Sequence, residues 1–541
     1  MLRATATRTL WVAARRVRSP APRLRITMSS AAASVKAPPE LRFTTSPAAP
    51  VDDSTLVVLG AKQRLLDAIT LLPEAARPVW SALVDAAAST SADNGGTSTT
   101  WLPPTSSGGK ARKLVCVALP SVCSRHNCEA QPHAVSTLLG GMLGSTSATV
   151  LLVIPAEHAL ATACAVARAV PVFSLKSSSS DKASETAASE KAVITAAVVT
   201  ETGAPSVTAG VLSTIQAAAD GVRFASRLVD TPPEEMSTTA LRQEARTVAD
   251  SLKGVTYTEI VGTQLRDGGF GGLWGVGRAA VEPPALVILS YTPPAGVLDP
   301  SLPGIALVGK GIVYDTGGLS LKVGGTMPGM KCDMGGAAGV LAAFQAAVQC
   351  GVSRPLHCLL CIAENAIGQG AFRNDDVLRI FSGRTVEVNN TDAEGRLVLG
   401  DGVAYASQKL DVGIIVDMAT LTGAQLVATG KRHAAIVANT DELEAAAIRA
   451  GKASGDLVHP LPFAPEFYRG EFASKVADMK NSVKDRSNAQ SSCAANFVAE
   501  HLSKDWKGGW LHIDMAGPAW INERGTGYGV GLLMSFMGLP K

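Results

Sequence analysis

Seven residues that could carry out hydrolytic chemistry are concentrated in two glycine-rich segments, 308–333 and 389–399. The acidic ones are Asp315, Asp333, Asp392 and Glu394, and the basic ones are Lys310, Lys322 and Arg396. Four carboxylates that converge in one cleft would repel one another unless cations neutralised them. Two divalent metal ions would do so, and carboxylates that bridge two ions are a recurring design for activating water in hydrolysis.

A simpler interpretation exists for each acid taken alone. Asp333 precedes an expected helix at 337–348, and Asp392 and Glu394 precede one at 397–406. The helix dipole and the free N–H groups stabilise a carboxylate at a helix N-terminus. This would be enough to explain one isolated Asp, whereas four acids together favour a metal site. The spacing alone does not prove that the four meet.

The second segment carries a specific motif. Residues 390–397, Asn-Thr-Asp-Ala-Glu-Gly-Arg-Leu, are identical to the NTDAEGRL signature of the leucyl aminopeptidase family, M17, which the chain therefore resembles. The spacing of Lys310, Asp315, Lys322 and Asp333 agrees with this family. The likeness extends over about residues 210–541, through Gly275-Val-Gly-Arg, Asp417-Met-Ala-Thr-Leu-Thr-Gly-Ala and His512-Ile-Asp-Met-Ala-Gly. One departure is Thr316, where the family usually has Ser, and the hydroxyl is kept.

The resemblance implies a role for each site residue. One tightly held ion would be bound by Lys310, Asp315, Asp333 and Glu394, and a more exchangeable ion by Asp315, Asp392 and Glu394. Lys310 would have to be neutral to bind, and two adjacent dications would lower its pKa. Lys322 would polarise the scissile carbonyl, and Arg396 would hold a bicarbonate ion that acts as general base. Positions lining or bracing the substrate pocket would be Met330, Asn390, Thr420, Leu421 and Gly423, although ordinary packing explains these nearly as well.

The expected activity is therefore a metal-dependent aminopeptidase that uses two Zn or Mn ions per subunit. It would release leucine and other apolar residues from peptide N-termini, and the resemblance implies a homohexamer. The expected compartment is the cytoplasm, with mitochondria as the alternative. Two alternatives stay open. Some bacterial relatives bind DNA, and the site could also serve a metallohydrolase that acts on something other than peptides.

Alternating strand and helix patterns predict the elements that position these residues. Residues 50–205 read as a smaller α/β domain with strands near 55–60, 113–119, 149–154 and 192–199. A connecting helix is expected within 206–229, followed by a catalytic domain over 230–541. Strands near 285–290, 305–309, 356–363 and 413–417 should form a mostly parallel sheet flanked by helices, with the site at their carboxyl ends. Two polar low-complexity segments, 89–113 and 174–189, are expected to be surface loops.

The composition excludes several classes of protein. Hydrophobic residues make up 46% and charged residues 18%, so the chain can bury a core and is not disordered overall. The net charge is only +3, without a basic patch in the body of the chain, so nucleic acid is not the expected partner. The apolar runs are too short for a membrane helix. The nine scattered cysteines do not suggest a disulfide framework, and Cys358 and Cys361 should face opposite sides of one strand.

The N-terminal segment differs from the rest. Its first 39 residues hold seven Arg and one Lys, with no acid before Glu40. Such a leader, taken here as residues 1–49, is typical of a disordered mitochondrial transit peptide. A basic tail, or an extension before a start at Met28, would explain it equally well.

Overall fold

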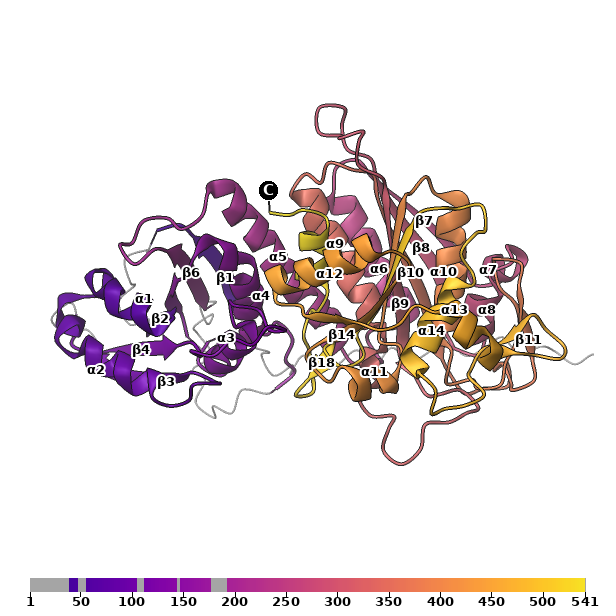
Figure 1. Cartoon of the computed structure of the whole chain (residues 1–541), viewed down its shortest axis with the longest axis horizontal. Helices are drawn as coiled ribbons and strands as arrows, with labels where there is room; N and C mark the ends of the chain where they lie inside the picture. The colour runs from indigo at the N-terminus through magenta and orange to yellow at the C-terminus, as the bar shows by residue number, and fades with distance from the viewer. Residues whose placement is uncertain (1–37, 47–54, 105–110, 144–145, 177–191, 541) are drawn as a thin grey trace, which may run out of the picture. The chain divides into compact units, whose positions relative to one another are not determined.

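Two sheets, each flanked by helices, form the framework of the chain in the computed structural model (Figure 1). The structure describes residues 38–46, 55–104, 111–143, 146–176 and 192–540. All of these residues except 174–176 belong to one compact unit spanning 37–173 and 189–541. Both sheets lie in this unit.

The first sheet has six strands in the order β1-β6-β5-β2-β4-β3. Their bounds are β1 Glu40–Thr44, β2 Thr55–Gly60, β3 Gly96–Leu102, β4 Arg112–Ala118, β5 Ala148–Val153 and β6 Val193–Val199. All neighbours pair in parallel except β3, which is antiparallel to β4. Helices α1 (Lys62–Asp67) and α2 (Arg77–Ala88) cover one face, and α3 (Pro132–Leu139) and α4 (Ala159–Ala169) cover the other. Burial on both faces explains the continuous apolar runs of β2 and β5.

Two strands differ from the expectations. Strand β1 lies inside the range 1–49, so the prediction of a disordered leader is wrong for this part. The segment is ordered because Leu41 and Phe43 are buried on one face and the strand pairs with β6. Strand β3 lies inside the expected loop 89–113. Its Thr-rich sequence reads as a polar loop because it is an edge strand that is buried only at its two ends and alternates between half-buried and exposed residues between them. Residues 1–37 and 47–49 of the leader, 105–110 of the first expected loop and 177–189 of the second lie outside the described residues.

Helix α5 (Ala209–Asp230) follows the first sheet and includes the expected helix. The hydroxyl of Thr208 accepts a hydrogen bond from Val211 N and caps its first turn. The helix ends before Thr231-Pro-Pro, where proline disfavours a helical conformation at the preceding residue. It packs against both α4 and α9, so it connects the helices around the two sheets.

The second sheet has eight strands in the order β15-β14-β17-β13-β9-β10-β8-β7. Their bounds are β7 Val255–Val261, β8 Ala285–Tyr291, β9 Ile305–Asp315, β10 Leu356–Asn365, β13 Ile414–Ala419, β14 Ala434–Ala438, β15 Val458–Pro460 and β17 Gly509–Asp514. The central strands β17, β13, β9 and β10 are parallel, whereas β14 is antiparallel to β17, and β8 to β10. The sheet is therefore mixed but parallel at its centre, and the predicted α/β class is confirmed.

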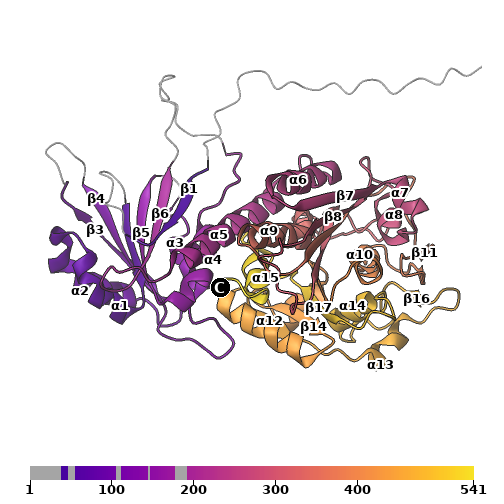
Figure 2. The ribbon, with the colours of Figure 1, turned by 90° about the horizontal axis from the view of Figure 1, so that it is seen from above.

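Helices cover both faces of this sheet (Figure 2). Helix α9 (Gly335–Gln349) packs on one face, and α10 (Gly395–Lys409) and α14 (Gln490–Ala499) on the other. Cys358 and Cys361 of β10 belong to the cores on opposite faces, as predicted. The remaining α-helices are α6 Thr238–Ser251, α7 Thr263–Asp267, α8 Gly271–Gly277, α11 Gly423–Ala428, α12 Asp441–Ser454, α13 Pro465–Tyr468 and α15 Val530–Phe536. Across the described ranges, no helix combines the length and apolar character needed to cross a membrane.

Candidate active site

The carboxyl ends of three neighbouring strands, β13, β9 and β10, carry the core of the site. Asp315 is the last residue of β9, Asn365 is the last residue of β10, and Thr420 directly follows β13. Asp333 lies in the short 3-10 helix Met330–Met334 before α9, and Glu394 is the N-cap of α10. The active site of an α/β protein usually lies at this edge of a parallel sheet.

Lys310 lies at the centre of the buried side of the site. Its Nζ is 2.8 Å from Asp333 Oδ1 and 2.9 Å from Glu394 Oε1, and it donates a 3.1 Å hydrogen bond to the Thr420 carbonyl. Burial lowers the pKa of Lys310, but the charges of Asp333, Glu394 and Asp315 outweigh it and raise the pKa above its ordinary value. A Cβ at position 395 would come within 2.6 Å of this Nζ, so any side chain at this position would displace the Lys310 ammonium from its place among the acids.

Lys322 occupies the more open side. Its Nζ is 2.9 Å from Asp315 Oδ2 and 2.6 Å from Asp392 Oδ1. The side chain of Asp392 is 33% exposed and that of Lys322 is 16% exposed, whereas that of Lys310 is 3% exposed. A ligand arriving from solvent would therefore meet Lys322 and Asp392 before Lys310.

Four carboxylates thus face two lysine ammonium groups, so negative charge is in excess. Burial, and then the charge of Asp315, raise the pKa of Glu394 to about 7. Burial also raises the pKa of Asp333 and of Asp392. Oxygens of Asp315, Asp392 and Glu394 lie within 4.8 Å of one another, close enough to share a cation. Asp333 Oδ2 is buried without a hydrogen-bond partner in the described part of the chain. Carboxylate oxygens are hard ligands, and this group has an excess of negative charge and one oxygen without a hydrogen bond. It is therefore a suitable donor set for divalent metal ions.

Arg396 lies behind this cluster, near the start of α10. Its Nη1 donates a 3.0 Å hydrogen bond to the carbonyl of Asn481, while its Nε is buried without a partner among the described residues. Burial lowers the pKa of Arg396 to about 10. A guanidinium with a free donor, at a helix N-terminus, can hold a small anion.

The five residues expected around the substrate are placed differently from one another. Thr420 contacts both Lys310 and Asp333. Asn390 accepts a 3.0 Å hydrogen bond from Asp392 N and so shapes the turn that carries this acid. Leu421 N donates to Asp514, and Gly423 begins α11 beside open space, where an added Cβ would meet nothing within 4 Å. Met330 begins the 3-10 helix of Asp333.

Sequence reasoning missed two residues that organise the site. Asn365 donates 2.8 Å to Asp315 Oδ1, and also to the Thr391 carbonyl, so it ties the two glycine-rich segments together. Asp514 accepts hydrogen bonds from Leu421 N, Thr422 N and the Thr422 hydroxyl, and so fixes the turn after β13. Both residues end buried strands of the central sheet, a position that could have identified them.

Comparison with known families gives two matches. Residues 223–534 match the catalytic domain of the cytosol aminopeptidase family, and residues 54–179 match domain 2 of the M17 aminopeptidase N-terminal domains. The first match spans the whole candidate site, and the second spans most of the first sheet. A mouse protein, "Probable aminopeptidase NPEPL1", is 50% identical over 422 residues, which are 78% of each chain.

Solved structures extend the likeness to most of the chain. The apo leucyl aminopeptidase from Trypanosoma cruzi is 38% identical, with a TM-score of 0.81 over 93% of this chain and 98% of that one. The bottromycin maturation enzyme BotP in complex with Mn is 27% identical, with a TM-score of 0.69 over 90% of this chain and 99% of that one.

Proposed function

We propose that this chain, which belongs to the cytosol aminopeptidase family, M17, uses two divalent ions to release leucine and other apolar residues from peptide N-termini. Membership of the family makes it a metal-dependent exopeptidase. The observation that carries the two-ion proposal is the excess of negative charge around Lys310 and Lys322. Asp333 Oδ2, buried without a partner in the described structure, adds a ligand atom that a cation would satisfy.

The residues that would hold the ions divide into two overlapping sets. Lys310, Asp315, Asp333 and Glu394 would hold the inner ion, and Asp315, Asp392 and Glu394 the outer one. The proximity of oxygens in the second set supports this division. Zn or Mn is proposed, because Lys310 adds a nitrogen ligand to the carboxylate oxygens. When bound, the ions would supply Lewis acidity and a water molecule of lowered pKa.

Lys322 would act on the scissile carbonyl. Its ammonium is the less buried of the two, and it lies on the side of the site that a substrate would enter. As the carbonyl oxygen gains negative charge, a fixed donor from Lys322 lowers the barrier. The two contacts of Lys322 with Asp315 and Asp392 hold its Nζ in the cleft before the substrate arrives.

Arg396 would hold the general base. Its unsatisfied Nε and its place at the start of α10 support binding of bicarbonate, whose oxygen would take a proton from the attacking water. The hydrogen bond from Nη1 to Asn481 fixes the guanidinium plane, so the anion would be presented in one orientation.

Substrate selection would lie around the turn after β13. Gly423 leaves open space there, and Met330 and Leu421 would provide apolar contacts beside Thr420. The similarity to a protein named leucyl aminopeptidase, from Trypanosoma cruzi, supports a preference for leucine. The free α-amine of the peptide would bind within the acidic cluster, which restricts cleavage to the first peptide bond.

The decisive experiment combines metal analysis with peptidase assays on the purified protein. We expect about two ions per chain, hydrolysis of leucine p-nitroanilide, and no hydrolysis of the N-acetylated analogue, which lacks a free amine. Bound metal without any hydrolysis of leucine substrates or peptides would refute the proposed substrate class. Comparison of Leu, Ala, Lys and Asp p-nitroanilides would then test the apolar preference.

The proposal also includes a division of the chain, an assembly and a compartment. Because β1 pairs with β6, the N-terminal domain would begin at 40 and not at 50, and would extend to 205. A connecting helix, 206–229, and a catalytic domain, 230–541, would follow, and the chain would assemble as a homohexamer in the cytoplasm. Light scattering of the purified protein measures the assembly. Fusion of residues 1–39 to a fluorescent reporter separates cytoplasm from mitochondria, because a transit peptide would carry the reporter into mitochondria.

A further inference from the structure

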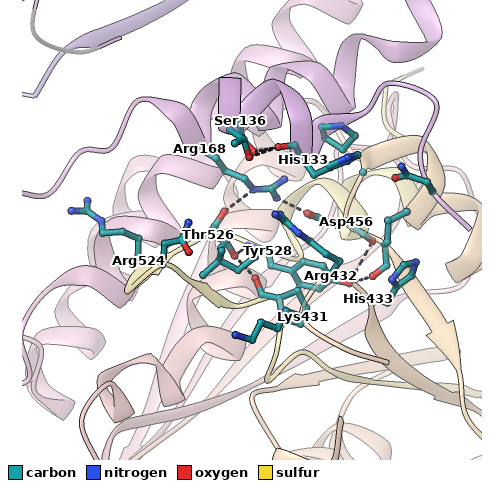
Figure 3. Close-up of a pocket in the computed structure, with 18 of the residues that line it drawn as sticks. His133, Ser136, Arg168, Lys431, Arg432, His433, Asp456, Arg524, Thr526 and Tyr528 are labelled. Atoms are coloured by element: carbon teal, nitrogen blue, oxygen red, sulfur yellow. Dashed lines mark hydrogen bonds and ion pairs between the residues drawn. The ribbon is translucent and has the colours of Figure 1, made fainter. Parts of the chain in front are cut away.

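A cavity of about 590 Å³ is lined by none of the residues of the candidate active site (Figure 3). One wall comes from helices that cover the first sheet, with His133 and Ser136 on α3 and Arg168 on α4. The other wall comes from loops of the second sheet, with Arg432 after α11 and Asp456 after α12. The volume is in the range of sites that hold small organic ligands.

The lining of this cavity is strongly basic. It includes Arg168, Lys431, Arg432 and Arg524, whereas Asp456 is its one acidic residue in the described chain. Asp456 is already paired with Arg168, at 2.5 Å, and Arg524 pairs with Asp230 at 2.8 Å. Lys431 and Arg432 have no hydrogen-bond or ion-pair partner for their side chains within the described ranges. Two cations are therefore left without counter-charge.

The uncompensated charge is concentrated around Arg432. In Figure 3 its side chain extends toward that of Arg168, so two guanidinium groups approach one another. Desolvation and then the charge of Arg168 lower the pKa of Arg432. Burial and then the charge of Arg432 likewise lower the pKa of His133. In both shifts the contribution from a neighbouring arginine indicates a positive potential, which an anion in the cavity would neutralise.

Arg168 and the backbone that carries Lys431 and Arg432 are held in place, whereas the side chains of Lys431 and Arg432 are exposed. Arg168 Nε donates 2.8 Å to the carbonyl of Thr526, and its Nη2 bonds Asp456. Gln425 of α11 donates to the carbonyls of Gly430 and His433, on either side of Lys431 and Arg432. The backbone that carries the two unpaired cations is thus fixed to α11, so a ligand would have to order only the side chains of Lys431 and Arg432.

We propose that this cavity binds a small phosphate monoester with at least two negative charges. Arginine presents a planar set of donors that matches phosphate oxygens, and two unpaired cations suit a dianion. The cavity is large enough to take the organic part of such a molecule as well as the phosphate. The lining shares no residue with the candidate active site, so the cavity would be a separate binding site.

The test uses the full-length, metal-loaded protein and fructose 1,6-bisphosphate as the probe, with fructose as the uncharged control. Calorimetry at physiological salt should show one site per chain for the bisphosphate and none for fructose. Lys431→Gln/Arg432→Gln should weaken binding about tenfold or more, the loss expected for one charge-assisted hydrogen bond. The matched pair Lys253→Gln/Lys475→Gln removes two exposed cations elsewhere and should leave binding unchanged.

Two further variants keep the result interpretable. Asn522→Asp adds a negative charge at the cavity without removing a cation, at a positive-φ position that Asp tolerates, and should also weaken binding. Arg396→Ala should bind normally, which separates this site from the candidate anion site of the active centre. Absence of binding, or equal loss in the matched pair, would overturn the proposal. Loss of bisphosphate binding in Arg396→Ala would also overturn it. So would a changed oligomer size in Lys431→Gln/Arg432→Gln if the unmodified protein binds no bisphosphate.

Discussion

The hydroxyl of Thr420 donates a 2.8 Å hydrogen bond to Oδ1 of Asp333. The same carboxylate oxygen lies 2.8 Å from Lys310 Nζ, which in turn donates to the Thr420 carbonyl. The turn after β13 is therefore part of the inner cluster and not only a wall of the cleft. Whatever fixes this turn also fixes the positions of Lys310 and Asp333.

Asp514 is the residue that fixes it, and Asp514→Ala should impair both stability and catalysis. The substitution leaves the part-buried Leu421 N–H and the buried Thr422 N–H without their acceptor, at about 1–3 kcal/mol for an unsatisfied buried group, and leaves the Thr422 hydroxyl only Ser491 Oγ as a partner. We expect a lower Tm, less bound metal and a reduced kcat. Asp514→Asn keeps one acceptor oxygen and should restore most of the loss, while Asp505→Ala, at an exposed position, should change nothing. An Ala variant with normal metal content and kcat would show that the turn is held by other contacts.

Removal of metal should abolish peptide hydrolysis, because the site has an excess of buried negative charge that cations must neutralise. A chelator followed by gel filtration should give inactive protein with a lower Tm. Zn, Mn or Co should restore activity, whereas Mg should restore less, because it prefers oxygen ligands and retained waters. Full activity in protein shown by elemental analysis to be metal-free would contradict the metal site.

Glu394→Ala should lose more metal than Asp392→Ala. Glu394 is 1% exposed, lies 2.9 Å from Lys310 and is assigned to both ions, whereas Asp392 is assigned to one and lies at the open side. Metal stoichiometry after dialysis of both variants measures the difference. Equal losses would show that the assignment of Glu394 to both ions is wrong.

His501 should make the stability of the protein sensitive to acid. It is fully buried, and burial lowers its pKa to about 3, so the native state keeps it neutral while the unfolded chain takes up a proton near pH 6.5. The unfolded state then binds more protons between pH 6.5 and 3, so stability falls as the pH falls through this range. Between pH 7.5 and 5.5 the loss should be about 1.4 kcal/mol. Urea unfolding of metal-free protein, compared with His501→Asn, isolates this contribution, and an equal pH response in both would exclude it.

The helices and strands could be predicted from the sequence more completely than the order in which the strands lie side by side in the sheets. Runs such as 285–290 and 356–363 became β8 and β10, because continuous apolar residues suit a sheet covered on both faces. Strand β3 was missed because an edge strand exposes one face and so carries polar residues. Asn365 was missed for another reason. Its contact with Asp315 exists only because β10 lies beside β9, and no local pattern reveals the order of strands.

The last prediction concerns Lys322 and Arg396, the two site cations that are not proposed metal ligands. Lys322→Ala should lower kcat by about 10²–10³, the usual cost of removing one donor to a developing oxyanion. Its metals should stay bound, because removing an ammonium from beside Asp315 and Asp392 leaves more negative charge for the ions. Lys475→Ala, at an exposed position, is the matched control.

Arg396→Ala should lose less, because water or another anion can partly replace a general base worth about 10²–10⁴. Added bicarbonate should stimulate the unmodified enzyme and leave the Arg396 variant unchanged, since Nε and Nη1 would no longer hold the anion. Steady-state kinetics with metal analysis on the same samples separates the two roles. If Lys322→Ala instead loses its metals and regains its rate when they are resupplied, Lys322 serves to hold the carboxylates in place and does not act on the carbonyl.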